Sequence, residues 1–486
     1  MRRSEFFLVL LLAAAPPLAY APAWSEGRLL APGDGAALHL PLRAEVWRAW
    51  DRGEVPSWND AAFSGTPLLA SYRPGAFHPL TVALTPIAPF AAFQVLVLAS
   101  LALAGPLAFL YARRLGAEPV GALVAGLGFA LGPYLVAHLG DTAAVVAAPA
   151  LPLVLLAAEA HLARARAATA AFLALAVALL LFAGSPEAVG AGSLLLVIRL
   201  LLAFFVPPFA WGADRGAGRR GALALSTGAS VLAGALLAAP QLLPTLVALH
   251  EAGPGGAGAA DTKALALAGL AGLLVRYASH APAAVFALAA VPLLANLPTL
   301  RSMAAVAGFV FTLFLARGVP EGAGALALAF DFALALLGGL SLSAQWRDRR
   351  APRGESLRRL TLLAALCAAA SLSVATTVTG PLAQDLAAPV GLLALGLVLY
   401  FALAGRREAV VAHVFLLPLV AAFLIQPWGR HAWAGAPTVA EVERATPTRE
   451  ALDRAMGPRR SERTLTLSTS WPRERERDLA WANLAS

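Results

Sequence analysis

The chain has 486 residues, of which 59% are hydrophobic and only 13% are charged, and its mean hydropathy is +0.72. Soluble globular proteins carry about 25% charged residues, so this composition excludes a soluble globular protein and predicts a polytopic membrane protein. The net charge of +9 comes mainly from arginines dispersed in short clusters between apolar runs, which is typical of topology signals and argues against a nucleic-acid partner. The single Cys367 excludes an intrachain disulfide and a cysteine-based metal site.

The first apolar segment, near 5–23, follows Arg2 and Arg3. Its short apolar core and the small-residue pattern Ala19-Tyr20-Ala21 are typical of a cleavable signal peptide, and the same stretch is also suited to a retained first span. Both interpretations leave the N-terminal arginines in the cytoplasm and send the following chain outside.

About thirteen apolar runs have the length of a membrane span, at roughly 20 residues each. Backbone polar groups in lipid must be satisfied within the segment, so these runs predict an all-α integral membrane fold. The runs lie near 5–23, 90–111, 119–138, 143–160, 167–184, 188–210, 221–240, 282–299, 302–316, 323–344, 360–378, 388–404 and 409–427. We therefore expect a membrane domain over 1–427 and an external polar tail over 428–486.

Arginines follow every second apolar run, which predicts that these connections are cytoplasmic. They are Arg2, Arg3, Arg113, Arg114, Arg164, Arg166, Arg215, Arg219, Arg220, Arg301, Arg347, Arg349, Arg350, Arg353, Arg358, Arg359, Arg406 and Arg407. The opposite, external side then receives 24–89, the short turns 139–142 and 185–187, the loop 241–281 and the tail. Within that loop, the short apolar stretch 262–281 is compatible with a re-entrant or interfacial helix.

The large external loop 24–89 begins with an amphipathic segment over 36–52. One helical face carries an apolar residue at every fourth position: Leu38, Leu42, Val46 and Trp50. Tryptophans such as Trp47 favour the headgroup layer, so we expect an interfacial helix on the outer leaflet. Arg43 and Arg48 lie off the apolar stripe, and we expect them to contact lipid headgroups.

The second half of this loop, PSWNDAAFSGTPLLASYRPGAFHP, is rich in turn signals and predicts a compact irregular lid. It bears Asp60, Tyr72, Arg73 and His78. Aromatic rings stack on sugars, arginine binds phosphate in a bidentate manner, and a carboxylate accepts a proton from a hydroxyl. The composition of the lid therefore suits the recognition of a phosphorylated sugar.

The run from Asp34 to Leu80 resembles the first external loop of the YfhO-like family of bacterial polytopic membrane proteins, which belongs to the GT-C class of lipid-dependent glycosyltransferases. Three later passages are also similar to that family. They are FAGSPEA at 182–188, AAPQLLPTLVALHEAG at 238–253 and YASHAPAAVFALA at 277–289.

The resemblance implies a GT-C-like fold in the bacterial cytoplasmic membrane. It implies transfer of a sugar from a polyprenyl-phosphate carrier to a cell-envelope glycan or teichoic-acid-type polymer, with membrane lipid, the lipid-linked donor and the polymer acceptor as partners. A catalytic Asp or Glu lies in the first external loop of that class, which points to Asp34. Members continue into a sizeable external domain, so 428–486 reads as the start of a truncated soluble domain.

Each candidate residue also has an ordinary structural interpretation. Asp34 lies between two glycines, where aspartate commonly caps a helix or a turn. Glu187 is most simply an acid in the first turn of a helix. The candidates for substrate binding are Trp58, Tyr72, Arg73, Phe77, His78, His138, Asp141, Gln241, Arg276 and His280. Among them, Trp58, Tyr72 and Phe77 are expected to shape a sugar pocket, and Arg73 with Arg276 or His280 to neutralise the phosphate of the carrier.

The structural alternatives for the other candidates stay open. His78 precedes a proline, and His138 and Asp141 suit a polar helix end. Arg276 and His280 could equally anchor to lipid phosphates. No ligand cluster demands a metal, although a divalent ion is compatible with the chemistry.

Ionisable residues inside apolar runs are candidates for a functional role because a charge in lipid is energetically costly. Arg199, Asp331 and His413 qualify. A buried Arg199–Asp331 pair is conceivable, but snorkelling of Arg199 to the interface is the favoured interpretation.

Two other functions compete with the transferase. A transporter or flippase of lipid-linked sugars predicts ionisable residues deep in several helices and repeat symmetry between halves, and neither is evident in the sequence. A non-catalytic envelope-assembly protein would keep the scaffold and tolerate Asp34→Asn.

Overall fold

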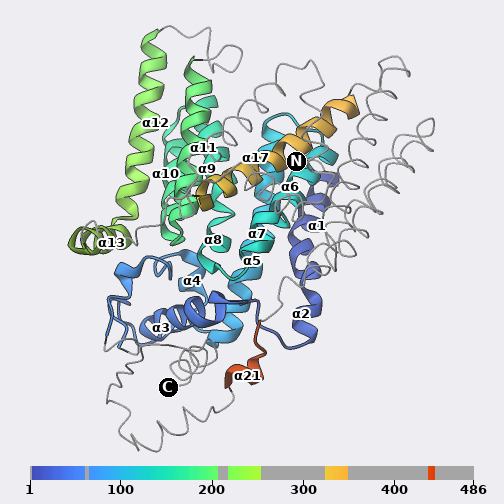
Figure 1. The fold of residues 1–486 in the computed structure, drawn as a ribbon. Coiled ribbons are helices and arrows are strands. Elements are labelled where there is room, and N and C mark those ends of the chain that lie inside the picture. The colour runs from blue at the N-terminus through green and yellow to red at the C-terminus, as the bar shows by residue number, and fades with distance from the viewer. Residues whose placement is uncertain (1–2, 61–64, 206–216, 253–322, 348–435, 444–486) are drawn as a thin grey trace, which may run out of the picture.

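The computed structural model describes residues 3–60, 65–205, 217–252, 323–347 and 436–443 (Figure 1). Within these ranges the regular structure is helical, apart from two isolated bridges. The helices of the N-terminal half are α1 (Arg3–Ala19), α2 (Ala21–Ser25), η1 (Gly35–His39), α3 (Leu40–Asp51), η2 (Leu69–Ser71), α4 (Pro79–Ala83), α5 (Pro89–Arg114), α6 (Pro119–Ala130), α7 (Pro133–Ala137), α8 (Thr142–Ala147) and α9 (Ala150–Ala163). They are followed by α10 (Ala167–Phe182), α11 (Pro186–Phe205), α12 (Ala217–Leu237), α13 (Ala239–Ala252), α17 (Ala323–Arg347) and α21 (Val439–Glu443).

The chain is an all-α, multi-pass membrane protein, as its composition predicts. Within the described residues, four segments are long and apolar enough to cross a membrane: Pro89–Arg114, Pro119–Ala137, Thr142–Ala163 and Pro186–Phe204. The bent pair α12 and α13 makes a fifth candidate, and α1, α10 and α17 contain shorter apolar helices. The expected spans near 282–299, 302–316, 360–378, 388–404 and 409–427 lie outside the described residues, as do 262–281 and His413, so the expected total of thirteen stays a prediction.

Two of the expected spans are broken helices. The run near 119–138 divides into α6 and α7 at Leu131 and Gly132, and Pro133 begins the second piece. The Asp331 carboxylate of α17 accepts the backbone N–H of Tyr134 in the first turn of α7. The run near 143–160 likewise divides into α8 and α9. The two short helices, α7 and α8, therefore lie on either side of the turn 139–142.

The expected loop at 241–281 begins with a helix, α13, and this part of the prediction is wrong. α13 turns through 76° relative to α12 at Ala238, and Figure 1 shows it crossing the lower end of α12. Its outward residues Leu243, Leu246 and Val247 are exposed and apolar, whereas Gln241 in its first turn is fully buried. A segment of this length is too short to span, so hydropathy alone did not identify it.

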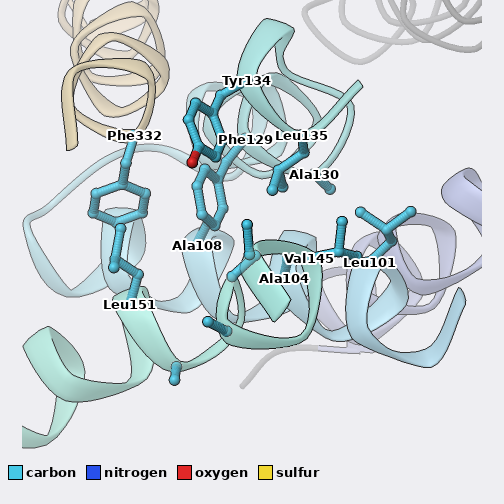
Figure 2. Packing of buried hydrophobic residues seen from close by; sticks show 14 of the residues in the cluster. Leu101, Ala104, Ala108, Phe129, Ala130, Tyr134, Leu135, Val145, Leu151 and Phe332 are labelled. Carbon is cyan, nitrogen blue, oxygen red and sulfur yellow. The ribbon is translucent and has the colours of Figure 1, made fainter. Parts of the chain in front are cut away.

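The core lies between α5, α6, α9 and α17 (Figure 2). The Phe332 ring of α17 packs edge-on against Phe129 of α6, with 4.8 Å between ring centroids, and stacks against Tyr111 of α5. Close approach of α6 and α17 depends on small residues, because a Cβ at Gly121 would lie 2.1 Å from the carbonyl oxygen of Gly339. Such small-residue contacts are the usual basis of helix packing in membranes.

The two ends of the bundle are marked by contacts between distant segments. At one end, Arg113 Nη2 of α5 lies 2.6 Å from Glu5 Oε1 of α1. At the other, the Leu29 N–H donates to the Pro437 carbonyl oxygen at 2.9 Å, and Arg28 pairs with Thr438 in an isolated bridge. The described part of the tail therefore lies against the start of loop 24–89. Which of these ends faces the cytoplasm stays a prediction from the arginine distribution.

Arg199 does not snorkel. Its Nε donates to Glu159 Oε1 of the neighbouring helix α9, and the two side chains are only 13% and 3% exposed. The expected alternative partner, Asp331, interacts with the α7 backbone instead. Glu159 lies inside an apolar run, and no local sequence pattern indicates that it pairs with Arg199.

Candidate functional site

The predicted amphipathic helix over 36–52 is confirmed, since η1 and α3 are helical without interruption from Gly35 to Asp51. The expected orientation of Arg43 is wrong, because this side chain is 0% exposed and faces the bundle. Trp47 is buried beside it, and its indole N–H donates to the Thr81 carbonyl oxygen at 2.8 Å. The helix therefore presents a cation and aromatic rings to the molecule's interior, in addition to an apolar stripe.

A cluster of ionisable side chains forms where four segments meet. Arg73 lies 3.7 Å from Asp141 (Nη1 to Oδ2) and 3.8 Å from Glu187 (Nη2 to Oε1), and His39 Nε2 lies 3.5 Å from Asp141 Oδ1. We refer to His39, Arg73, Asp141 and Glu187 as the Arg73 cluster. These residues come from η1, the lid, the turn before α8 and the first turn of α11. The external connections predicted to share one side of the membrane are thus brought together at one end of the bundle.

The ion pairs of the Arg73 cluster are long and open to solvent. Separations of 3.7–3.8 Å exceed the usual 2.7–3.2 Å of an N–H···O hydrogen bond. The Arg73 side chain is 40% exposed, and both of its acidic partners are more than a fifth exposed. Asp141 has a second interaction, because its Oδ1 caps α8 by accepting the Ala144 N–H at 3.3 Å. The guanidinium is therefore positioned but not saturated with hydrogen bonds.

Asp34 lies at the edge of this cluster. It is exposed and immediately precedes η1, and among the described residues its carboxylate forms no ion pair and no cap hydrogen bond. A Cβ at Gly35 would lie 3.1 Å from the Gly140 carbonyl oxygen, so the Asp34 turn packs against the segment that carries Asp141. The negative charge of Asp34 acts on His39 and opposes the lowering of the His39 pKa by burial.

His39 is neutral at physiological pH. Burial, followed by the charges of Arg43 and Arg73, lowers the pKa of this imidazole to about 3, while Asp34 and Glu187 oppose the shift. A neutral imidazole carries one N–H donor and one acceptor nitrogen. His39 therefore contributes hydrogen-bonding capacity to the cluster without adding positive charge.

Arg43 supplies a second positive charge beneath the cluster. Its Nη1 donates to Thr81 Oγ1 at 3.2 Å, whereas Nε and Nη2 have no hydrogen-bond partner within the described part of the chain. Burial lowers the pKa of Arg43 to about 10 and Asp141 raises it, so the guanidinium stays charged at neutral pH. Buried polar groups in native proteins are almost always satisfied, so we expect these two nitrogens to have a hydrogen-bond partner outside the described residues, such as a water or a ligand oxygen.

The positive charge of Arg43 also acts on His78. Burial, followed by the Arg43 charge, lowers the pKa of His78 to about 3, and its Nδ1 has no hydrogen-bond partner among the described residues. His78 immediately precedes α4, as expected of a residue before Pro79. Its buried position places it under the site rather than at an open surface.

The turn that carries Arg73 is strained. Tyr72 has φ +63° and ψ −47°, and the Arg73 N–H donates to the Ser71 carbonyl oxygen at 2.7 Å, which makes Tyr72 the centre of a γ-turn with positive φ. Turns of this kind are rare for a residue with a side chain and cost about 1–3 kcal/mol. The Tyr72 hydroxyl, 2.6 Å from the Leu181 carbonyl oxygen, donates to it, and burial of the ring raises the pKa of the phenol. Its contacts therefore anchor the turn to the end of α10.

Two glycines allow this turn to approach the connection between α10 and α11. Gly75 has φ +58°, and a Cβ there would lie 2.9 Å from the Phe182 carbonyl oxygen. Gly184 has φ +82°, and a Cβ there would lie 2.5 Å from the Tyr72 carbonyl oxygen. Both positions require a backbone that only glycine adopts readily, so the lid and the Glu187 turn fit together backbone to backbone.

Gln241 joins both of these segments to α13. Its Oε1 accepts the Phe77 N–H at 3.2 Å, and its Nε2 lies 3.4 Å from the Tyr72 carbonyl oxygen and 3.3 Å from that of Phe182. The Phe77 ring packs between Trp50 and Phe182, with centroid separations of 5.6 and 6.4 Å. Gln241 and Phe77, which were expected to bind substrate, are thus engaged in holding the lid.

The remaining expected residues are distributed around this centre. Trp58 is 51% exposed and lies over Gly65, next to the Asn59–Thr66 bridge. His138 stacks on the Tyr134 ring, and its Nδ1 lies 2.9 Å from the Tyr134 carbonyl oxygen. Arg276 and His280 lie outside the described residues. Within the described ranges, no group of three or more His, Cys, Asp or Glu side chains is arranged to hold a metal ion.

His39 was not among the predicted site residues, and Arg43 was predicted to contact lipid headgroups instead. His39 and Arg43 are four residues apart, so they share a helical face. That spacing is the signal that could have found them, since both lie on the side that packs onto the bundle. Glu187 was identified, but only as a helix acid, and its pairing with Arg73 depends on tertiary contact.

Comparison with known proteins identifies similar folds but no family. The crystal structure of ArnT from Cupriavidus metallidurans in the apo state aligns with a TM-score of 0.52 and 18% identity, covering 89% of this chain and 78% of that one. The crystal structure of the same protein bound to undecaprenyl phosphate aligns with a TM-score of 0.53 and 19% identity, covering 91% and 81%. No protein-family model and no curated protein matches this chain.

Identity at this level establishes the fold alone. The expected GT-C-like architecture is therefore confirmed, because this chain shares most of its length with the ArnT fold. The resemblance to the YfhO-like family is not confirmed by these matches and stays a prediction.

Proposed function

We propose that this chain is a membrane glycosyltransferase, moving a sugar from a polyprenyl-phosphate carrier to a cell-envelope glycan or a teichoic-acid-type acceptor. The observation that carries the proposal is the Arg73 cluster with Asp34 at its edge, on a fold shared with a protein that has been crystallised with undecaprenyl phosphate. A cation held by long ion pairs, beside a carboxylate that forms no ion pair within the described ranges, suits the breaking of a sugar–phosphate bond.

Arg73 is proposed to bind the phosphate of the carrier. Its pairs with Asp141 and Glu187 are long enough to be replaced by phosphate oxygens, and a guanidinium binds two of those oxygens at once. The buried Arg43 adds positive charge from below. Arg276 and His280 stay in the proposal as further candidates for the same phosphate.

Asp34 is proposed to act as the general base. The acceptor hydroxyl oxygen forms a bond with the anomeric carbon, while the bond between that carbon and the phosphate oxygen breaks and its electron pair leaves with the carrier phosphate. The hydroxyl proton passes to the Asp34 carboxylate. A single displacement of this kind inverts the anomeric configuration.

The aromatic residues divide into two groups in this proposal. Trp58 is half exposed, and its ring is available to stack on a sugar. Tyr72 and Phe77 are engaged with Leu181, Trp50 and Phe182, so they shape the wall of the site from behind. His138 and Gln241 bond to surrounding backbone groups, and His78 is buried under the site.

The proposed topology places this chemistry outside the bacterial cytoplasmic membrane. The arginine distribution predicts a cytoplasmic N-terminus and an external loop 24–89. The contacts of Arg28 and Leu29 with 436–438 support an external position for the described part of the tail in this topology.

Replacement of the base tests the proposal. Asp34→Asn should reduce transfer of radiolabelled sugar from a defined polyprenyl-phosphate donor by at least about 100-fold, as expected for loss of a general base. Asp51→Asn is the matched control, because Asp51 is an exposed carboxylate at the far end of the same helical segment. Both variants should insert into membranes as the wild type does. Full transfer by Asp34→Asn would remove Asp34 from the mechanism, and the absence of transfer by the wild-type protein would reject the proposed function.

A further inference from the structure

Gln241 is one of the most fully enclosed polar side chains of the site, and it is more than 160 residues away in sequence from the lid that it contacts. Its amide bonds with backbone groups of Tyr72, Phe77 and Phe182. Two of these groups flank the turn that presents Arg73, and the third begins the turn that presents Glu187. One side chain thus joins both segments that carry the ion pair.

The turn that Gln241 holds is not self-supporting. Tyr72 has a positive φ that is unfavourable for a residue with a side chain, so the surrounding contacts must compensate. Those contacts are the Tyr72 hydroxyl bond to Leu181 and the amide of Gln241 on the Tyr72 carbonyl oxygen. Loss of either would let the backbone relax and carry the Arg73 guanidinium away from its acidic partners.

We propose that Gln241 is a positioning residue that fixes the Arg73 guanidinium by clamping the strained Tyr72 turn onto the α10–α11 connection. Because Gln241 lies in the first turn of α13, the position of Arg73 is tied to the angle between α12 and α13. The inference depends on the proposed function only for the choice of undecaprenyl phosphate as a probe. The clamp itself is a property of the unliganded protein.

The chain offers a matched control in Gln94 of α5. This side chain also bridges backbone groups, since its Oε1 accepts the Leu30 N–H at 2.9 Å and its Nε2 lies 3.3 Å from the Arg28 carbonyl oxygen. It ties the start of the external loop to α5, away from the lid. Gln241→Leu and Gln94→Leu therefore remove the same kind of contact from different places.

The first measurement is amide hydrogen exchange over residues 68–78 in the full-length protein without ligand. Gln241→Leu should speed exchange in this segment by about tenfold, the effect of losing one to two hydrogen bonds. Gln94→Leu should leave exchange there unchanged. Tyr72→Phe, which removes only the hydroxyl, should give a change in the same direction and about threefold in size.

The second measurement is the affinity of protein in lipid nanodiscs for added undecaprenyl phosphate. Gln241→Leu should weaken binding by about tenfold in the wild-type background and have no further effect in an Arg73→Gln background. Equal weakening in both backgrounds, or an equal effect of Gln94→Leu, would overturn the positioning role. If the wild-type protein does not bind undecaprenyl phosphate, the proposed function fails, and the exchange of 68–78 alone decides the clamp.

Discussion

Two arginines of this chain are paired with acids in opposite ways. Arg199 and Glu159 form a short pair between α9 and α11 with little exposure, whereas Arg73 reaches Asp141 and Glu187 only at 3.7–3.8 Å and is 40% exposed. The first pair has the features of a packing element, because a buried charge must be neutralised where it lies. The second has the features of a binding group, because its partners hold it in place without saturating its donors.

The largest effect is expected from breaking the buried pair. Glu159→Ala leaves the Arg199 charge uncompensated between helices and should lower the free energy of unfolding by about 3–5 kcal/mol. The measurement is detergent-induced unfolding in mixed micelles. The double variant Glu159→Leu/Arg199→Met should recover most of the loss, since it removes both charges. Equal stability of Glu159→Ala and the wild type would show that the pair is not buried as described.

A smaller effect is expected from pH, through the histidines beneath the site. His39 and His78 have folded-state pKa values of about 3, below the unfolded value of 6.5, so the unfolded chain binds more protons between these limits. Stability therefore falls as pH is lowered from about 6.5 towards 3, with a slope near 1.4 kcal/mol per pH unit for each histidine. The free energy of unfolding, measured at pH 7, 6 and 5, gives this slope.

His39→Gln should reduce that slope by about one histidine's share, because glutamine does not titrate. The variant keeps hydrogen-bonding capacity at the same position. A slope identical to that of the wild type would contradict the buried, neutral state assigned to His39.

The smallest stability effect is expected at Arg73. Arg73→Gln should change the free energy of unfolding by less than about 1 kcal/mol, because exposed ion pairs are screened by water. The same unfolding assay used for Glu159→Ala gives a direct comparison. A loss as large as that of Glu159→Ala would show that Arg73 belongs to the packing of the bundle, and would remove the contrast between the two arginines.

Much of the fold could be predicted because lipid imposes a simple rule on the chain. Apolar runs of spanning length became helices in each described case, and the period of four over Leu38, Leu42, Val46 and Trp50 located α3. Alternation of the arginines also predicted that the lid and Asp141 lie at one end of the bundle. Both arguments use local patterns that do not depend on the details of packing.

The misjudged features all depend on tertiary contact. Arg43 was expected in the headgroups because charged helix residues usually face water, yet packing of α3 on the bundle buries it. α13 is too short for a span, and it bends by 76° relative to α12 and contacts η2 of the lid. The role of Gln241 depends on backbone groups that precede it in the chain by more than 50 residues in one case and by more than 160 residues in the others. No local pattern encodes such a contact.

The affinity of the full-length protein for undecaprenyl phosphate, compared with that of its Arg73→Gln variant in the same nanodiscs, tests the central claim most directly. If Arg73 holds the carrier phosphate, wild-type binding should be saturable, and the variant should bind at least about tenfold more weakly, as expected for loss of a charge-assisted contact. Arg48→Gln, which replaces an arginine paired with Glu45 on the same loop, should bind as the wild type does. Equal affinity of the wild type and Arg73→Gln would contradict the account.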